Sequence, residues 1–415
     1  DGMDESQKLA DNDHRRLGQE LDLFVFSDLV GPGLPLFTPR GTVLRTELDK
    51  YIQQMRDNVG FQGVNIPHIT KKELYQKSGH WTKFKDDLFH IKSREGHDFA
   101  MKPMNCPHHT QIYAAKPRSY RELPIRYRET TTNYRDEQTG ELNGLLRARS
   151  FTQDDAHVFC RESQVVEEFL KIWEIVEKFY KTFNFSLRLR LSSRDPMTPE
   201  AYAGKPEQWD KAEKELKEAL EKHGAQNLED GVGDAAFYGP KLDFVAVDSL
   251  GRDWQVATIQ IDFAQPEGLD LTYINEQGKT ERPVMIHHAV MGSIERFLAV
   301  YIEHTSGRFP VWLAPEQVRI ATLKDDPNIL KMAKDVVENA KVLGIRAELD
   351  DSNESVAKKV AEAEKMKVPY TVVIGEKEVQ SGRVTPRHRS DLPELPELTV
   401  NELLERLSQD AKSRR

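Results

Sequence analysis

The sequence contains very little cysteine and no long apolar run. Its only cysteines are Cys106 and Cys160, too few for a disulfide framework, so we expect a reducing, intracellular setting, the cytoplasm. No segment approaches the roughly 18 consecutive apolar residues of a membrane-spanning helix. The polar segment 1–20 also lacks the apolar core of a signal peptide. These absences disfavour secreted and membrane proteins.

An excess of positive charge is missing as well. The net charge of −9 disfavours a protein that coats nucleic acid nonspecifically, but it allows an RNA enzyme with a local basic face. Arginines cluster at 118–128, 147–149 and 383–389, where they form either such a face or ordinary solvated loops. With 415 residues, 38% of them hydrophobic, the chain suits two or three domains with real cores.

The order of apolar patterns divides the chain into a large and a small domain. Residues 1–15 are expected to be disordered or added by cloning, residues 16–309 to form the large domain, and residues 310–316 to be a linker. In the large domain, apolar spacing predicts helices at 46–55, 163–183, 206–223 and 290–304, and strands at 61–68, 185–191, 236–247 and 253–263.

The small domain, residues 317–415, has a simpler pattern. Strands at 317–323, 345–349 and 370–374 alternate with helices at 327–343 and 354–367. This alternation indicates a parallel sheet with crossover helices. The last helix begins with a capping box at Thr399-Val400-Asn401-Glu402.

Three widely separated residues, Cys106, His157 and His287, have the chemistry of a catalytic zinc site. A thiolate and two imidazoles suit zinc, and three protein ligands leave the fourth tetrahedral position open for substrate. The spacings of 51 and 130 residues place each ligand on a different element. Judged by spacing alone, such residues are more often unrelated, so the interpretation depends on their surroundings.

Residues 151–159 are predicted to form a strand with one polar face. Period-two geometry places Phe151, Gln153, Asp155, His157 and Phe159 on the same side. An amide, a carboxylate and an imidazole in a row indicate the floor of a polar pocket. The carboxylate could accept a hydrogen bond from a substrate hydroxyl or amine, or it could instead orient the imidazole.

Two segments carry arginines suited to an oligophosphate. Arg135 and Glu137 precede a glycine-bearing loop, and Arg147 follows it. Guanidinium groups match phosphate oxygens bidentately, although a surface ion pair between Arg and Glu is the alternative. Later in the chain, Arg296 lies in an apolar segment and needs a partner, either a phosphate or a carboxylate such as Glu295.

Taken in order, these segments resemble the three signature motifs of class II aminoacyl-tRNA synthetases. Residues 60–67 are similar to motif 1, a dimer strand ending in proline. Residues 135–151 are similar to motif 2, and residues 292–297 to motif 3. The resemblance runs from about Asp13 to the C-terminus and is closest to threonyl-tRNA synthetases, on four segments: Met104-Asn105-Cys106-Pro107, Phe151 to His157, Phe237-Tyr238-Gly239-Pro240-Lys241 and Val284-Met285-Ile286-His287.

The resemblance implies a fold and an activity. The fold would be α+β, with an antiparallel sheet flanked by helices and a small C-terminal α/β anticodon-binding domain. The activity would be ATP- and Mg²⁺-dependent activation of threonine and its transfer to tRNA(Thr). A homodimer would form through the motif 1 region.

The resemblance also implies roles for residues on the amino-acid side. Zn²⁺ on Cys106, His157 and His287 would take the amino and hydroxyl groups of threonine. Asp155 would hold the hydroxyl. The remaining residues implied to contact the amino acid or line the site are Gln153, Tyr238, Gln260, Lys241 and His80.

On the nucleotide side, Arg135 would bridge the threonine carboxylate and the ATP α-phosphate. Glu137 would read adenine, with Phe151 stacked on it. The outer phosphates and the rest of the ATP site would be served by Arg147, Arg296 and Gln255, and the anticodon by Arg387 and Arg389. Gln255 and Gln260 are five residues apart, so they share a face only if a bulge intervenes; otherwise one of them lies outside the site.

Three features depart from the family pattern. His108 stands where glycine is usual, and His288 stands where arginine is usual. Either imidazole could compete as a metal ligand or tune the pocket. We also expect the N-terminal domain that hydrolyses mischarged Ser-tRNA in this family to be absent.

Other functions remain open at this point. A seryl- or prolyl-tRNA synthetase is a rival within the class, although proline offers no hydroxyl to a zinc site. A catalytically inactive, synthetase-like RNA-binding or regulatory protein would have eroded motifs, yet Arg135, Glu137, Arg296 and the three metal ligands are all present. A protein with a purely structural zinc site is the third alternative.

Overall fold

The computed structural model describes residues 9–225 and 228–415, which divide into two compact units. The core unit comprises Val30–Leu34 and Asp49–Val300, and the terminal unit comprises residues 9–29, Pro35–Leu48 and Tyr301–Arg415. The terminal unit thus includes more than the predicted small domain. The reason is contact between distant segments: the ring of His14, for example, hydrogen-bonds Glu303 at 2.6 Å.

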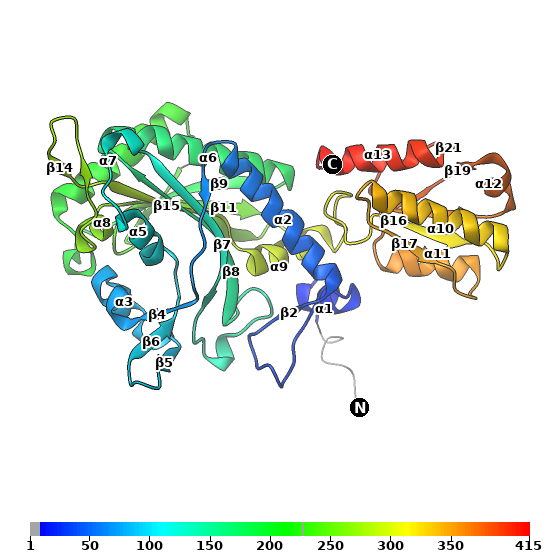
Figure 1. Cartoon of the computed structure of the whole chain (residues 1–415), viewed down its shortest axis with the longest axis horizontal. Coiled ribbons are helices and arrows are strands. Elements are labelled where there is room, and N and C mark those ends of the chain that lie inside the picture. Colours follow the sequence, from blue (N-terminus) through cyan, green and yellow to red (C-terminus); the bar gives the residue numbers. More distant parts are fainter. Residues whose placement is uncertain (1–8, 226–227) are drawn as a thin grey trace. The chain divides into compact units, whose positions relative to one another are not determined.

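The core unit is built on an eight-stranded sheet in the order β10-β9-β11-β12-β15-β8-β7-β3 (Figure 1). Its strands are β3 (Gln62–Gly63), β7 (Ile125–Tyr134), β8 (Ser150–Cys160), β9 (Ser186–Ser193), β10 (Leu228–Val232), β11 (Lys241–Val247), β12 (Asp253–Asp262) and β15 (Val284–Ser293). The central pairs are antiparallel, whereas the outermost pairs β10–β9 and β3–β7 are parallel. The α+β class is confirmed, with the correction that the sheet is mixed at its edges.

Helix α6 (Val165–Thr182) covers one face of this sheet. It packs against β9, β12 and β15, and α7 (Pro206–His223) packs on it. The apolar residues of α6 recur at helical spacing, and Phe169, Trp173 and Val176 are fully buried. Burying each such side chain contributes about 1.5–3 kcal/mol. The predicted helices at 163–183 and 206–223 are therefore confirmed within two residues.

Two boundaries in the core unit differ from the prediction. Helix α9 (Ile294–Thr305) begins four residues later than expected, because residues 290–293 still belong to β15. A fully buried strand is an apolar run, which periodicity alone does not separate from a buried helix. Similarly, β11 begins at Lys241 rather than at residue 236. The chain turns just before it, where a side chain on Gly239 would overlap the carbonyl oxygen of Ile261.

The predicted motif 1 strand at 61–68 is much shorter than expected. Of residues 61–68, only Gln62–Gly63, which form β3, pair with β7 as a regular strand. Beyond it, the amide of Val64 still donates to the carbonyl of Arg128, but the amide of Ile66 donates to the side chain of Glu129 at 2.8 Å. Pro67 then has no N–H to continue a ladder.

Smaller elements complete the core unit. A three-stranded sheet in the order β4-β6-β5 and a two-stranded ribbon lie beside short helices. These elements are β4 (Ile69–Lys71), β5 (His90–Lys92), β6 (Asp98–Met101), β13 (Tyr273–Ile274), β14 (Thr280–Glu281), α3 (Lys72–Ser78), α4 (His80–Lys83), α5 (Cys106–Ala114) and α8 (Ala264–Gly268).

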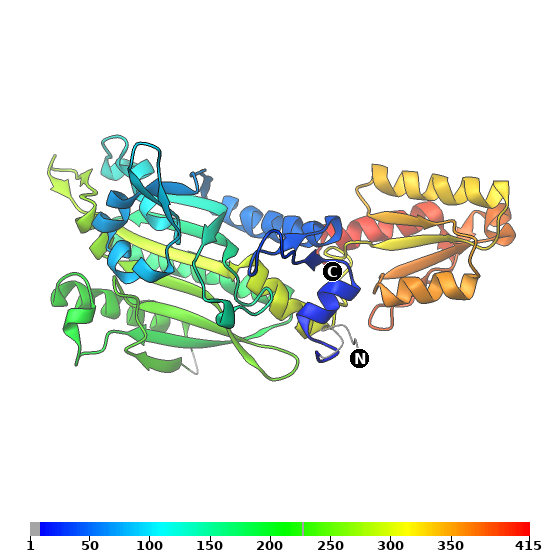
Figure 2. The ribbon, with the colours of Figure 1, turned by 90° about the horizontal axis from the view of Figure 1, so that it is seen from below.

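The terminal unit contains a four-stranded sheet in the order β17-β16-β18-β20. Strands β16 (Val318–Thr322), β17 (Ala347–Asp350) and β18 (Tyr370–Ile374) are parallel, and β20 (Arg387–His388) is antiparallel. Figure 2 shows α10 (Pro327–Val342) and α11 (Val356–Lys365) on opposite faces of this sheet. The predicted alternation of strands and helices is confirmed.

The remaining elements of the terminal unit belong to segments near the two termini of the chain. Near the C-terminus are α12 (Glu376–Ser381), the pair β19 (Arg383–Val384) and β21 (Leu398–Thr399), and α13 (Val400–Lys412). Thr399 caps α13 as predicted, because its hydroxyl accepts from the amide of Glu402.

Near the N-terminus, α1 (His14–Glu20) begins inside the segment expected to be disordered, with Asp13 as its cap; residues 1–8 of that prediction lie outside the described residues. The pair β1 (Phe24–Val25) and β2 (Leu36–Phe37) follows, and α2 (Pro39–Asp57) contributes to both units. None of the helices in the described part of the chain is long and apolar enough to cross a membrane.

Candidate active site

Three elements of the core unit bring Cys106, His157 and His287 together. Strands β8 and β15 are antiparallel neighbours, and His157 lies directly opposite His287 in their register. Cys106 is the first residue of α5. All three side chains are buried, and their potential ligand atoms lie within 4.8 Å of one another. The convergence predicted from the sequence is therefore present.

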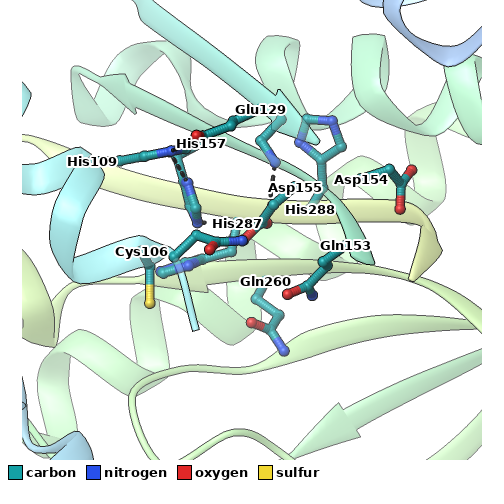
Figure 3. A network of polar contacts seen from close by, with 12 residues as sticks. Cys106, His109, Glu129, Gln153, Asp154, Asp155, His157, Gln260, His287 and His288 are labelled. Carbon is teal, nitrogen blue, oxygen red and sulfur yellow. Dashed lines mark hydrogen bonds and ion pairs between the residues drawn. The ribbon is translucent and has the colours of Figure 1, made fainter. Parts of the chain in front are cut away.

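The ring nitrogens of His157 are arranged as a metal ligand requires. Its Nδ1 lies 2.7 Å from Nδ1 of His109, and Nε2 of His109 lies 2.8 Å from a carboxylate oxygen of Glu129 (Figure 3). With one proton on His109, donated from Nε2 to Glu129, its Nδ1 accepts and His157 holds its own proton on Nδ1. The Nε2 of His157 then carries a lone pair, and among the described residues it has no hydrogen-bond partner.

The other two candidate ligands fit a metal as well. His287 places Nε2 2.7 Å from Oδ2 of Asp262, which leaves Nδ1 for a metal. Burial raises the pKa of the Cys106 thiol well above its ordinary value, so the pocket by itself does not produce a thiolate. A bound divalent ion would displace that proton. One sulfur and two imidazole nitrogens are a donor set that fits zinc.

His80, implied to line the site, lies beside this cluster. Its Nε2 is 3.6 Å from the sulfur of Cys106, and its Nδ1 is 2.7 Å from the hydroxyl of Ser78. Burial lowers the pKa of His80 to about 3, so its ring is neutral near pH 7. Gln265 also donates its amide to the sulfur, at 3.6 Å. Cys106 belongs to a buried apolar cluster with Tyr113, Phe159 and Met285, and its sulfur also has these two polar neighbours.

The polar floor predicted for β8 is present. Asp155 accepts from the amide of Asn105 at 3.1 Å, and Oε1 of Gln153 accepts from the amide of Asn133 at 2.8 Å. Asp154, the residue between them, uses its carboxylate to accept three backbone amides of the β15 turn, at 2.9–3.0 Å. Alternation along the strand therefore separates a pocket face from a structural face.

The segment before β11 and strand β12 form another side of the pocket. The hydroxyl of Tyr238 donates to Oε1 of Gln260, and its ring centroid lies 4.8 Å from that of His287. The register between β11 and β12 pairs Val245 with Gln255 and Phe244 with Ala257, so one extra residue, at 256, forms a bulge. The bulge required to place Gln255 and Gln260 on one face is therefore present.

Lys241 stands on the neighbouring strand, directly opposite Gln260. Its ammonium lies 3.3 Å from Oδ2 of Asp243, and Gln255 donates its side-chain amide to Oδ1 of the same carboxylate at 2.9 Å. Asp243, which the sequence did not single out, therefore connects Lys241 and Gln255. It lies two residues after Lys241, so strand alternation is the signal that could have identified it.

The motif 2 residues lie where β7 joins β8. Arg135 follows the end of β7, and its guanidinium lies 5.0 Å from the ring centroid of Phe151. Burial lowers the pKa of Arg135. Arg147 instead donates to Glu137, at 3.0 and 2.8 Å. The Arg–Glu ion pair that was the alternative for this segment is therefore formed.

The motif 3 arginine has a partner that was not expected. Arg296 donates to the backbone carbonyl of Gln255, and its guanidinium lies 5.8 Å from the ring centroid of Trp254. Glu295, one of the two partners left open, instead accepts from the amide of Thr152 at 2.6 Å. Glu295 thus connects motif 3 to β8, while Arg296 contacts β12 at Gln255.

The two unusual histidines do not join the metal cluster. His288 follows His287 on β15 and so points to the opposite face, where its Nε2 accepts from the buried Arg56 at 3.3 Å. His108 packs against the ring of Tyr75. In the part of the chain that the structure describes, the metal-binding geometry at this site includes neither of them. The imidazoles that lie next to the cluster are those of His80 and His109, and the sequence did not single out His109.

The two predicted anticodon readers differ from each other. Arg387 is exposed on β20. Arg389 donates to the carbonyls of Lys367 and Phe309 at 2.8 and 2.7 Å and pairs with Asp391 at 2.6 Å, and only 7% of its side chain is exposed. Arg389 therefore connects segments within the terminal unit. Arg387, by contrast, is exposed and has the geometry of a surface contact.

Comparison with known proteins identifies this arrangement. Residues 89–305 match the model of the class II tRNA synthetase core domain for G, H, P, S and T, and residues 317–410 match an anticodon binding domain. The fold and the site thus define a class II aminoacyl-tRNA synthetase core. The chain is 47% identical over 388 residues to the threonine–tRNA ligase of Cytophaga hutchinsonii, a match that covers 93% of this chain and 59% of that protein.

Solved structures agree with this match. The chain resembles the RNA binding domain of threonyl-tRNA synthetase from Cryptosporidium parvum, with a TM-score of 0.89, 37% identity, and coverage of 96% of this chain and 98% of that one. It also resembles a putative threonyl-tRNA synthetase from Aeropyrum pernix, with a TM-score of 0.84, 31% identity and 97% of both chains covered. The chain belongs to the threonyl-tRNA synthetase family. It spans about three fifths of the length of the curated relatives that it matches.

Proposed function

We propose that this chain is a threonine–tRNA ligase, which activates threonine with ATP to threonyl-adenylate and transfers it to tRNA(Thr). The observation that carries the proposal is the convergence of Cys106, His157 and His287 next to the polar face of Gln153 and Asp155. Relatives named for this activity support it. A metal site with an open position beside a carboxylate suits an amino acid that carries a hydroxyl.

In this proposal Cys106, His157 Nε2 and His287 Nδ1 hold Zn²⁺. When bound, the ion would supply a Lewis acid that takes the amino and hydroxyl groups of threonine. Asp155 accepts a hydrogen bond from the hydroxyl, and Gln153 donates its amide to the amino acid. Tyr238, Gln260 and His80 enclose the substrate and exclude water.

The activation step needs positioning more than covalent chemistry from the protein. A threonine carboxylate oxygen attacks the α-phosphorus of ATP, and pyrophosphate leaves in line with it. Arg135 contacts both the carboxylate and the α-phosphate, and Arg296 holds the outer phosphates with Mg²⁺. Glu137 and Arg147 must exchange their mutual ion pair for adenine and phosphate. Gln255 and Lys241 complete the pocket wall, and Phe151 stacks on the base.

The RNA contact belongs to the terminal unit in this proposal. Residues 317–415 bind the anticodon, residues 310–316 link them to the catalytic part at 16–309, and Arg387 is the better placed of the two candidate readers. The protein works as a homodimer through the motif 1 region, in the cytoplasm. Arg387→Ala should raise the KM for tRNA and leave threonine activation unchanged, whereas Lys358→Ala, an exposed cation on α11, should change neither.

ATP–pyrophosphate exchange measured with each amino acid tests the central proposal. Exchange that depends on threonine is the expected result. Exchange driven by serine or proline instead would favour one of the rival synthetases. No exchange with any amino acid, in a folded and zinc-loaded chain that still binds tRNA, would favour the catalytically inactive RNA-binding alternative.

A further inference from the structure

Lys102 is a buried ammonium group in the core unit that has no assigned role. It follows β6, and its backbone is fixed on both sides: its amide donates to His68 and its carbonyl accepts from Tyr134, both at 2.9 Å. The residue has no exposed surface. Four acceptors surround its Nζ, at 2.6–3.2 Å: Asn105 Oδ1, Thr131 Oγ1, Thr132 O and Asn133 Oδ1.

All four partners of this ammonium are uncharged oxygens. A buried charge without a carboxylate partner costs free energy, and an apolar residue of similar size would avoid that cost. Burial accordingly lowers the pKa of Lys102 to about 8, while the carboxylates of Glu129 and Asp155 partly oppose the shift. A role in packing alone does not require an ammonium here, whereas a role in orienting its neighbours does.

An ammonium has three donors and no acceptor, so it dictates which end of an amide faces it. Asn105 and Asn133 must both turn their oxygens toward Lys102, and their NH₂ groups then point away. The NH₂ of Asn105 donates to Oδ2 of Asp155 at 3.1 Å, and the NH₂ of Asn133 donates to Oε1 of Gln153 at 2.8 Å.

These two series of hydrogen bonds end at the substrate pocket, at Gln153 and Asp155. Because Oε1 of Gln153 is engaged, its NH₂ is the end left for a ligand, and Gln153 presents a donor. Asp155 accepts from Asn105 through Oδ2 and from the backbone amide of Ala156 through Oδ1, both at 3.1 Å, and each carboxylate oxygen keeps a further lone pair with which to accept from a ligand. If Asn133 turned its oxygen outward, Gln153 would have to turn over, and its polarity toward the pocket would reverse.

We propose that Lys102 is a positioning residue that fixes the hydrogen-bonding polarity of the amino-acid pocket through Asn105 and Asn133. The inference rests on the proposed function, in which Gln153 and Asp155 contact threonine. It specifies that Gln153 donates to an acceptor of the substrate, such as a carboxylate oxygen. Asp155 accepts from a donor, the hydroxyl or the ammonium.

The test replaces Lys102 with methionine, which keeps most of the volume and removes the donors. The matched control is Lys359→Met in the terminal unit, because Lys359 is also buried and its ammonium donates to the backbone and the hydroxyl of Thr322, at 2.9 and 3.0 Å. Thermal unfolding reports the stability cost of each change. ATP–pyrophosphate exchange is then measured at pH 7. The concentrations of threonine, valine and ATP are varied in turn.

Lys102→Met should raise the KM for threonine about 10–100-fold, the size expected when hydrogen bonds to a charged group are lost, and leave the KM for ATP within about threefold. The preference for threonine over valine should fall, because Asp155 is no longer fixed. Lys359→Met should change none of these. An unchanged threonine KM and preference in folded Lys102→Met, or an equal rise in both KM values, would overturn the inference.

A second variant serves if Lys102→Met does not fold. Asn133→Asp keeps an oxygen for Lys102 but removes the donor to Gln153, so it should raise the KM for threonine with little effect on the KM for ATP. A threonine KM equal to that of the unaltered chain would contradict the proposal.

Asparagine-selective ¹⁵N labelling gives a readout that does not depend on catalysis, because it detects the side-chain amides of asparagine directly. Slow exchange of the NH₂ protons of Asn105 and Asn133 should be lost in Lys102→Met, and its persistence would overturn the inference. Failure of the unaltered chain to activate threonine is a separate result, against the proposed function.

Discussion

The amino-acid side and the phosphate side of the candidate site are held by different kinds of contact. On the amino-acid side, His157 and Asp155 are buried and each is oriented by neighbours that are themselves hydrogen-bonded. On the phosphate side, Arg147 is half exposed and pairs with Glu137, and Arg296 donates to a backbone carbonyl. Under the proposed function, one side is preorganised for its ligand, whereas the other would exchange internal contacts for contacts with ATP.

This difference has a chemical reason. Threonine differs from valine by a single hydroxyl, so selecting it depends on a few polar atoms held in fixed positions. ATP carries several charges, which guanidinium groups can bind from several starting geometries. A rigid amino-acid pocket and an adaptable phosphate site are therefore what each ligand requires, and the following experiments test whether the two sides behave so differently.

The largest effect expected is discrimination between threonine and valine. Valine places a methyl where threonine has its hydroxyl, which leaves a metal position and Asp155 unsatisfied, so kcat/KM for exchange should be about 10⁴–10⁵-fold lower. Serine keeps the hydroxyl and lacks one methyl, so it should be only about 10–200-fold worse. Exchange kinetics with the three amino acids give both ratios. Equal rejection of valine and serine would mean that the amino-acid side is not organised around a hydroxyl.

The phosphate side should show a smaller but still large effect. Arg135→Ala removes the guanidinium proposed to contact the α-phosphate and should lower the exchange rate about 10²–10³-fold without unfolding the protein. Arg188→Ala, which removes an exposed arginine of β9, is the control and should be silent. Near-normal exchange by folded Arg135→Ala would remove Arg135 from the phosphate site. Arg296→Ala should behave like Arg135→Ala.

A third experiment examines the orientation of His157. In Glu129→Gln one oxygen remains for the amide of Ile66, while an NH₂ group faces His109 and forces its proton to Nδ1. His157 must then hold its own proton on Nε2, where the metal should bind, so zinc affinity should fall about 10–100-fold. Chelator competition followed by metal analysis measures it. Glu316→Gln, which alters a buried carboxylate that accepts from Arg319 in the terminal unit, should leave zinc affinity unchanged.

Cys106→Ser serves as the reference for complete loss in the same metal analysis. About one zinc per chain is expected before the change and almost none after it, because a hydroxyl is a poor ligand in a site built for sulfur. Cys160→Ser should keep its zinc, since Cys160 lies three residues from His157 on β8 and so faces the other side. Zinc retained by Cys106→Ser would refute the ligand assignment.

The sequence predicts those features of this site that depend on residues close together in the chain, and it does not predict those that depend on contacts between distant segments. Strand alternation is local, and it correctly separated the pocket face of β8 from Asp154. The spacing of Gln255 and Gln260 left two alternatives, a bulge or one residue outside the site, and the structure has the bulge. His109, Glu129 and Lys102 were missed because their roles arise from contacts between α5, β7 and the segment after β6, whose meeting no local pattern encodes. The motif 1 strand was overestimated because residues 64–67 are extended without regular pairing.

The smallest effect expected is a dependence of threonine binding on pH. As the pH rises, the contribution of Lys102 to threonine binding and its contribution to stability should change in opposite directions. The pKa of Lys102 is lowered by burial to about 8 from 10.5. Between these two values the unfolded chain holds the proton more often than the folded one, so the contribution of Lys102 makes the fold more stable as the pH rises through this window. The same loss of the ammonium proton should weaken threonine binding.

The charged and titratable groups that act on Lys102 or feel its charge are the carboxylates of Glu129 and Asp155 and the imidazoles of His68 and His108. The pKa values of these two imidazoles are lowered by burial and in part by Lys102 itself. The KM for threonine should therefore rise a few-fold between about pH 7.5 and 9 in the unaltered chain, relative to Lys102→Met. Both proteins share the titration of threonine's own amine, so the ratio of their KM values isolates Lys102. A ratio that stays constant would mean that the polarity of the pocket does not depend on this proton.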